Sequence, residues 1–197
     1  MESIGWITAV CLGLGLAAST GLNTFLPLLI AAVAGRFMGV HLGEHFSWLT
    51  SNTAIATLAI ATVLDTIADK VPAVDHALHA VGAFVRPLVA ALAAASVLPA
   101  DNGSTAAIIG LIIGSPAAFA FHAAKAGTRV ASSALSFGML NPVISIAEDF
   151  ASAGLTIASL LLPLFAPVFV VAAFALIWQI TKRAKAAKQP QPSVPTV

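Results

Sequence analysis

Charged residues are scarce in this chain, tyrosine is absent, and there is a single cysteine. Asp, Glu, Lys and Arg together make up 9% of the 197 residues, whereas a soluble globular protein carries about 25%. The mean hydropathy is +0.98. One cysteine, Cys11, excludes a disulfide framework within the chain. A net charge of +1, with no basic patch outside the C-terminal end, gives no indication of a nucleic-acid partner. The composition predicts a chain that lies in a lipid bilayer.

The sequence also lacks the short motifs of the common soluble enzymes. It contains no Gly-rich phosphate loop, no GxSxG, no HExxH and no CxxC. We therefore expect no enzyme activity and no cofactor, and the sequence leaves the question of a bound metal open.

Long apolar runs take up most of the length. A membrane-spanning helix needs roughly 20 apolar residues, so the chain has room for about six such segments. With Tyr absent, Trp6, Trp48 and Trp178 are the candidates for the interfacial aromatic belt. Four cations between 182 and 188 follow the last apolar run, which predicts a cytoplasmic C-terminus. Residues 182–197 are predicted to be a basic, then Pro-rich, disordered tail.

The two halves of the chain resemble one another weakly. The apolar runs 4–35 and 104–138 are both too long for one straight span. We expect the first to break at residues 19–24 and the second around Lys125, Gly127 and Arg129. Ile67-Ala68-Asp69 matches Ile146-Ala147-Glu148, and we expect each of these segments to end a helix. Three helices per half would insert with opposite orientations. We predict an all-α integral membrane protein of about six transmembrane segments. It would form two inverted three-helix repeats, 1–99 (with an interfacial insertion at 36–50) and 100–181, whose first helices are broken or re-entrant.

Charged and amide side chains interrupt these apolar segments at a few places. A charge at bilayer depth costs several kcal/mol unless it is paired or faces a water-filled cavity. With Asp75 included, five carboxylates face three cations, which suggests a surplus of two negative charges, or of one if Arg86 also points inward. Convergent carboxylates suit a hard cation or a transported proton. The residues predicted to bind substrate or ion are Asn23, Asp65, Asp69, Lys70, Lys125, Arg129, Glu148 and Asp149.

Three functions follow from this pattern. The first is a membrane transporter, most simply of a cation and with proton coupling, in which the acidic side chains bind the cargo and the cations act as counter-charges. The second is a flippase or scramblase for an anionic, phosphate-bearing lipid, with Lys125 and Arg129 contacting the headgroup. The third is a non-transporting membrane scaffold or assembly factor, held by the same charges as salt bridges. Expected partners are the lipid bilayer and a small ion or lipid headgroup. A homo-oligomer is compatible with the Gly- and Ala-rich helix faces.

Several motifs carry a resemblance to a known family. The segments GLNTFLPLLIAAVAGR, LDTIADKVPAVDHAL, FVRPL and HAAKAGTRVASSALSFGMLNPVISIAEDF resemble the bacterial membrane proteins grouped as domain of unknown function 4126. This resemblance implies a multi-pass protein of the bacterial inner (plasma) membrane and assigns no catalytic residue. The segment from Asp65 to Lys70 is also similar to the acidic-x-Gly-Asp-Lys motif of cation/proton exchangers, with one extra residue and Ala68 in place of the glycine.

Overall fold

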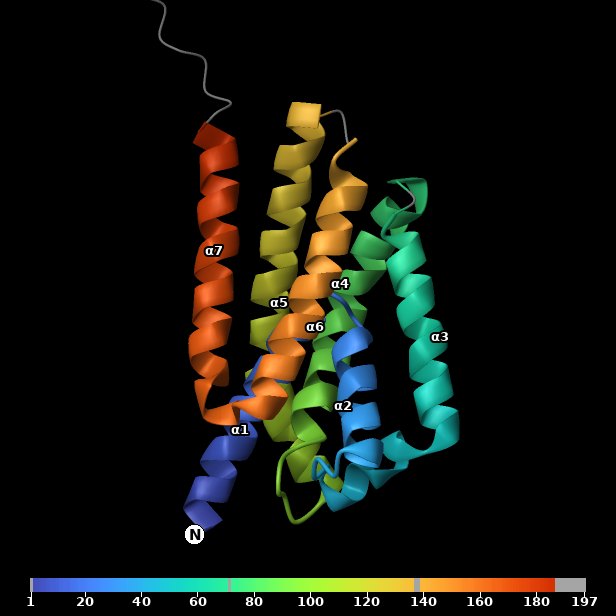
Figure 1. Cartoon of the computed structure of the whole chain (residues 1–197), viewed down its shortest axis with the longest axis vertical. Coiled ribbons are helices and arrows are strands. Elements are labelled where there is room, and N and C mark those ends of the chain that lie inside the picture. Colours follow the sequence, from blue (N-terminus) through green and yellow to red (C-terminus); the bar gives the residue numbers. More distant parts are fainter. Residues whose placement is uncertain (1, 71, 137–138, 187–197) are drawn as a thin grey trace, which may run out of the picture.

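The computed structural model describes residues 2–70, 72–136 and 139–186, and these residues contain helices and no strands. The tail predicted to be disordered lies outside them from residue 187 onward. The elements are α1 (Glu2–Thr20), α2 (Leu26–Phe37), η1 (Glu44–Thr50), α3 (Asn52–Ala68), α4 (Pro72–Ala95), α5 (Gly103–Ser136), α6 (Asn141–Leu161), η2 (Pro163–Phe165) and α7 (Ala166–Ala186). Figure 1 shows that the long helices stand side by side in one bundle.

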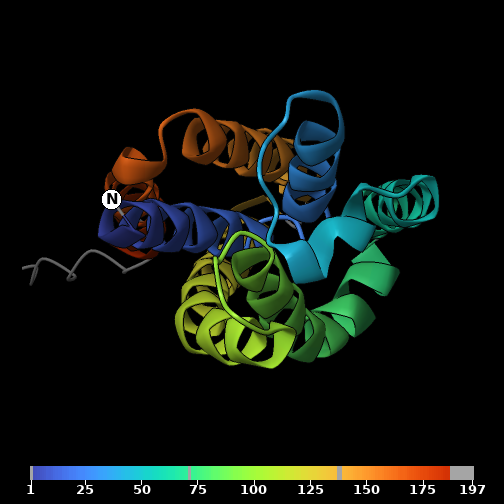
Figure 2. The ribbon, with the colours of Figure 1, turned by 90° about the horizontal axis from the view of Figure 1, so that it is seen from below.

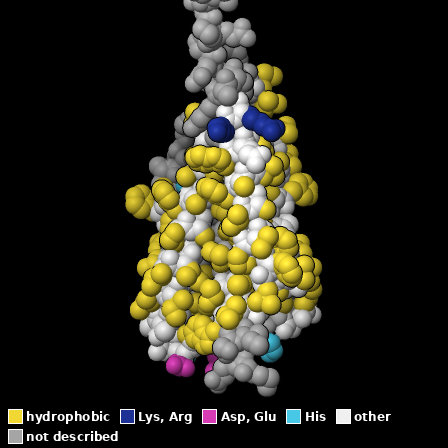
Figure 3. All heavy atoms as spheres, turned by 90° about the vertical axis from the view of Figure 1, so that its left-hand side faces the viewer, with side chains coloured by type: hydrophobic (Ala, Val, Ile, Leu, Met, Phe, Trp, Pro, Cys, Tyr) yellow, Lys and Arg dark blue, Asp and Glu magenta, His cyan; other side chains and the backbone are white. Residues whose placement is uncertain are grey.

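Several helices are apolar and long enough to cross a membrane. Within the described residues three meet this test, in α5, α6 and η2–α7, and a fourth does if η1 and α3, which bend by 68°, form one span. Apolar side chains cover the face seen in Figure 3, with Lys and Arg toward one end and acidic side chains at the other. For the described residues, the predicted all-α fold with several candidate membrane spans is confirmed. The count of six spans is not, because α1, α2 and the described apolar part of α4 are shorter.

The first apolar run folds as a hairpin of two short helices. Ser152 on α6 donates to the Ser19 carbonyl at 3.0 Å, and the Asn23 side chain reaches Asp149 at 2.8 Å, so α1 runs antiparallel to α6. Residues 29–40 then pass back beside residues 157–161 of α6. The chain therefore reverses direction between Thr20 and Leu26, inside the bundle (Figure 1). The predicted interruption of the first run is confirmed.

Local chemistry explains the position of this reversal. The Asn23 side-chain carbonyl accepts a hydrogen bond from the Leu26 backbone amide at 3.2 Å, which fixes the turn just before α2, and Pro27 suits the first turn of this helix. A Cβ on Gly21 would lie 2.5 Å from the Ala118 carbonyl oxygen and from Phe121 Cβ, so glycine lets the hairpin tip approach α5 closely. We call residues 21–25 the hairpin tip.

Two sequence predictions about the second half are wrong. α5 continues without interruption from Gly103 to Ser136, through the expected break at Gly127 and Arg129. The helix does not need to unwind there, because the Arg129 side chain reaches Glu148 on α6 from within the helix. α6 does not end at Glu148 and Asp149. Asn141-Pro142 starts this helix, which continues to Leu161, so the acidic pair lies near its beginning.

Small residues allow the central helices to pack closely. α4 and α5 touch along a row of alanines, and a Cβ on Gly110 would lie 2.3 Å from the Ala91 carbonyl oxygen. Such contacts are typical of helix association in membranes. In the end-on view of Figure 2, α1 passes through the middle of the bundle while α3 stands at its edge. The tip of the α1–α2 hairpin is thereby enclosed by the surrounding helices.

Candidate functional site

Five charged side chains form a buried cluster at the hairpin tip. They come from four parts of the chain: the C-terminal end of α3, α4, α5 (twice) and α6. We call them the inner network: Asp69, Arg86, Lys125, Arg129 and Glu148. Their side chains are between 0% and 10% exposed.

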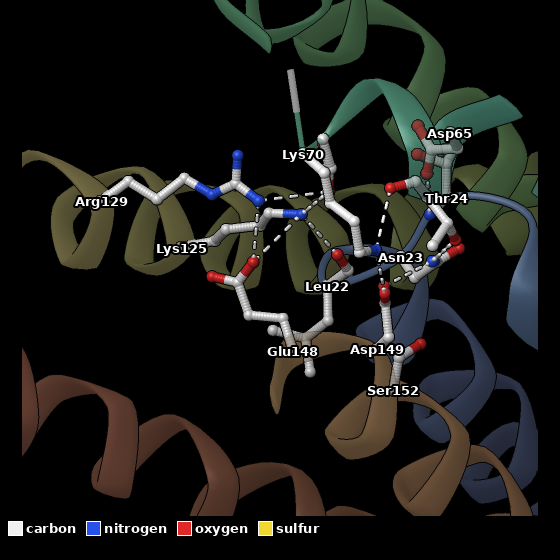
Figure 4. A network of polar contacts seen from close by, with 12 residues as sticks. Leu22, Asn23, Thr24, Asp65, Lys70, Lys125, Arg129, Glu148, Asp149 and Ser152 are labelled. Atoms are coloured by element: carbon white, nitrogen blue, oxygen red, sulfur yellow. Dashed lines mark hydrogen bonds and ion pairs between the residues drawn. The ribbon is translucent and has the colours of Figure 1, made fainter. Parts of the chain in front are cut away.

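Lys125 occupies the centre of the inner network, and its side chain is 0% exposed. Its ammonium donates to the Leu22 carbonyl oxygen at 2.9 Å and to the Asp69 carboxylate, and it lies 3.3 Å from Glu148 Oε2. Figure 4 shows the Lys125 ammonium between the Leu22 carbonyl and the Glu148 carboxylate. Since an ammonium group has three donors, these three oxygens match its full capacity.

The two arginines bind the carboxylates and the hairpin tip. Arg129 Nη2 lies 3.1 Å from Glu148 Oε2 and 3.3 Å from Asp69 Oδ2. Arg86 Nη2 lies 3.9 Å from Asp69 Oδ1, and Arg86 Nη1 donates to the Gly21 carbonyl at 3.1 Å. The backbone carbonyls that lose their helical partners at the interruption therefore accept hydrogen bonds from cationic side chains. Unwound backbone is tolerated at membrane depth where it is buried in protein in this way.

A second group of polar residues lies beside the first and is more exposed. We call Asn23, Asp65, Lys70 and Asp149 the outer network. Asn23 donates to Asp149 at 2.8 Å, and Lys70 lies 3.4 Å from the same carboxylate. The Asp65 carboxylate accepts from the Thr24 amide at 3.0 Å. The side chains of Lys70 and Asp149 are 32% and 18% exposed, so the outer network connects the buried charges to the surface of the bundle.

All eight residues predicted from the sequence lie in these two networks, and all of them except Asp69 are labelled in Figure 4. Sequence reasoning placed Arg86 in the site only conditionally, although an arginine inside the apolar segment FVRPL is a direct signal of a buried charge. It did not identify the Leu22 carbonyl as a partner of Lys125. That contact depends on the hairpin tip and has no signature in residue type.

The predicted surplus of negative charge is not found among the described side chains. The inner network has two carboxylates and three cations, and the outer network has two carboxylates and one cation. The predicted count also included Asp75, whose side chain lies outside the described set, and it included Arg86 only on the condition that this side chain points inward. Across both networks the described charges balance.

One atom of the inner network is available to a further partner. Asp69 Oδ1 is buried and makes no hydrogen bond with any described residue. A buried carboxylate oxygen without a hydrogen bond is an uncommon feature that calls for a water, an ion or a functional explanation. Within the described part of the chain, no three His, Cys, Asp or Glu side chains come together as a metal-binding group.

Comparison with known proteins identifies a family. The family model with the description "Domain of unknown function (DUF4126)" matches residues 10–183, which cover most of the chain and both networks. No curated protein and no solved structure matches the chain. By the extent of that match, the chain belongs to the DUF4126 family.

Proposed function

We propose that this protein transports a cation across the membrane and that the inner network is its binding site. The observation that carries the proposal is the environment of the Lys125 ammonium, which is held by oxygens of Leu22, Asp69 and Glu148 at full burial. A backbone carbonyl and two carboxylates are the ligands that hard cations prefer. Transporters use unwound backbone carbonyls of interrupted helices to coordinate ions in the same way.

The cost of the inner network supports a function beyond holding the bundle together. Replacing a buried ion pair by apolar residues of similar volume is often neutral or stabilising. The close packing of α4 on α5 shows that this chain also joins helices through small apolar residues. Holding helices together with five charges at membrane depth therefore costs more free energy than apolar packing would. Ionisable groups at that depth usually mark an ion pathway.

The outer network provides a route to this site. Asp65 and Asp149 would attract a cation from the more exposed end, and Asp69 and Glu148 would bind it further inside. Lys70, Lys125 and Arg129 act as counter-charges while no cargo is bound. The α1–α2 hairpin closes the other side, since Ser19, Thr20 and Asn23 are all 0% exposed. In this arrangement the inner site is occluded, and transport requires the hairpin or α3 to move.

The proposal includes the finer architecture. The inverted repeat remains a proposal from the sequence match alone, because Asp69 lies at the C-terminal end of α3 whereas Glu148 lies in the first half of α6. Lys182 and Arg183 lie in the last turns of α7, which supports a cytoplasmic C-terminus. The resemblance of the sequence motifs to the DUF4126 family supports a bacterial inner membrane as the location.

Thermal stability of the purified protein in detergent tests the proposal. Cargo that binds only the folded state raises Tm, by an amount that grows with its concentration. We expect stabilisation by chloride salts of at least one cation, lost in Asp69→Asn and kept in Asp101→Asn, whose side chain is exposed. Stabilisation by short-chain phosphatidylglycerol and by no cation would support lipid translocation instead. No stabilisation by either would contradict transport and favour a scaffold.

A further inference from the structure

We propose that this protein binds an anionic phospholipid, with one acyl chain in an apolar groove beside α3 and the headgroup on Arg36. The inference is independent of the proposed cation transport. It concerns the segment 36–50, which the sequence marks as an interfacial insertion and which lies outside both polar networks. The groove and the cation lie at the η1 end of the bundle, opposite the C-terminal end of α7 (Figure 1).

The groove separates part of α3 from α2 and α4 and has a volume of about 340 Å³. Its walls are the C-terminal part of η1, the first two turns of α3 from Ser51 to Leu58, Leu28 of α2 and Leu92 of α4. The atoms exposed in it are almost all apolar. At 1.5 Å per residue, the stretch of α3 that lines the groove is about 10 Å long. An extended hydrocarbon chain lying along α3 matches this shape.

The size of the groove excludes a helix as its occupant. One turn of an α-helix, about 10 Å across and 5.4 Å long, takes up roughly 420 Å³, which exceeds the volume of the whole groove. A helix from a second copy of the chain therefore does not fit. The acyl chains of the surrounding bilayer are apolar and much thinner, so one of them is able to enter.

Arg36 provides a positive charge at one end of this groove. Its Nη1 donates to the Thr50 carbonyl oxygen at 3.0 Å, and Thr50 lies between Leu49 and Ser51, which both line the groove. The Arg36 side chain is exposed and forms no ion pair with any described residue. A guanidinium has five N–H donors, so donors remain for a phosphate group, which arginine binds through two parallel hydrogen bonds.

Aromatic side chains place this charge at the depth of the lipid headgroups. Trp48 lines the groove and is 53% exposed, and Phe37, whose ring centroid lies 5.5 Å from the Arg36 guanidinium carbon, is 73% exposed. Exposed tryptophans of membrane proteins gather at the interface with water. α3 begins close by at Asn52, and the N-terminal end of a helix favours a negative group. The site therefore complements an anionic headgroup better than a zwitterionic one.

Titration of the purified chain in one detergent tests the headgroup contact, with Kd taken from thermal shifts and bound lipid from native mass spectrometry. Dioctanoyl phosphatidylglycerol should bind about tenfold more tightly than dioctanoyl phosphatidylcholine, since one hydrogen-bonded charge pair is at stake. Arg36→Gln should remove this preference, and Lys182→Gln, at an exposed position on α7, should retain it. Lipid bound at the inner network would keep its preference in Arg36→Gln. That result, or equal affinities for the two lipids in the wild type, would overturn the proposal.

Substitutions on α3 test the acyl-chain groove. Ala54→Phe fills the groove, whereas Ala56→Phe adds the same ring at an exposed position that does not line it. Ala54→Phe should weaken phosphatidylglycerol binding by about tenfold, the equivalent of about two buried CH₂ groups, and Ala56→Phe should not. Thr57→Phe, at a second position of the groove, replaces Ala54→Phe if that variant fails to fold.

Three results would overturn the assignment of the groove. The first is unchanged lipid affinity in the groove variants. The second is glycerol phosphate, which has no acyl chain, binding as tightly as phosphatidylglycerol. The third is a dimer in native mass spectrometry that is lost in Ala54→Phe, because the groove would then hold a second copy of the chain. Loss of lipid affinity in Ala54→Phe and Arg36→Gln, with Ala56→Phe and Lys182→Gln unchanged, is the result that we expect.

Discussion

Asp69→Asn, a change within the inner network, should destabilise the protein far more than the loss of any acidic side chain that lies outside that network. Asp69 contacts Lys125, Arg129 at 3.3 Å and Arg86 at 3.9 Å, and its side chain is 1% exposed. Its removal takes away the described carboxylate partner of Arg86 and leaves Glu148 as the described carboxylate that Lys125 and Arg129 share. Removing one partner of a buried ion pair costs about 3–5 kcal/mol.

Two further substitutions calibrate this cost. Asp149→Asn breaks the pair with Lys70 at 3.4 Å, whose side chains are 18% and 32% exposed, and should cost about 0–1 kcal/mol. Asp101→Asn removes an exposed carboxylate and should leave the stability near that of the wild type. In the double variant Asp69→Asn/Lys125→Met, part of the loss should be recovered, because the central unpaired cation is removed as well.

The assay is thermal unfolding of the purified protein in one detergent, without added cargo. For a chain of this size, about 2–4 °C of Tm corresponds to 1 kcal/mol, so Asp69→Asn should lower Tm by roughly 6–20 °C. The double variant should unfold at a higher temperature than Asp69→Asn alone. Equal Tm values for Asp69→Asn and Asp101→Asn would refute the argument that the inner network is buried and mutually dependent.

Two other predictions concern the hairpin and the topology. Gly21→Ala should lower Tm and cation flux, because its Cβ would lie 2.5 Å from a backbone oxygen of α5, whereas Gly154→Ala, with open space around it, should be neutral or slightly stabilising. Similar Tm values for both glycine variants would contradict the close approach of the tip. In a variant without Cys11, a cysteine at Glu44 and one at Lys182 should react with a membrane-impermeant reagent from opposite sides, because η1 and the end of α7 lie at opposite ends of the bundle (Figure 1). Labelling of both from the same side would contradict the proposed placement in the membrane.

Composition and charge pattern predicted the helical class of the protein and the polar residues that lie together in the two networks. Apolar runs interrupted by isolated charges indicate a membrane bundle, and a charge such as Lys125 has to find a partner there, so the clustering of Asp69, Lys125, Arg129 and Glu148 followed from energetics alone. The family resemblance was also confirmed. Neither argument required knowledge of the topology.

The direction and continuity of the helices were not predictable in the same way. Hydropathy does not distinguish one long helix from two antiparallel short ones, because both present the same apolar surface to lipid, so the reversal between Thr20 and Leu26 was open. The segment around Gly127 contains the same kinds of residue as the helix break at the hairpin tip. α5 nevertheless stays helical there, because carboxylates on other elements pair with Lys125 and Arg129. Whether a glycine interrupts a helix depends on such tertiary contacts.

The most direct test of the central claim is cation uptake into proteoliposomes that contain wild-type protein, Glu148→Gln or Glu44→Gln. Glu148 lies in the inner network, and Glu44 is an exposed residue of η1 that provides a matched control for the same chemical change. We predict uptake by the wild type and by Glu44→Gln, and none by Glu148→Gln, provided that each protein reconstitutes to the same extent. Undiminished uptake by Glu148→Gln would contradict the assignment of the inner network as the transport site.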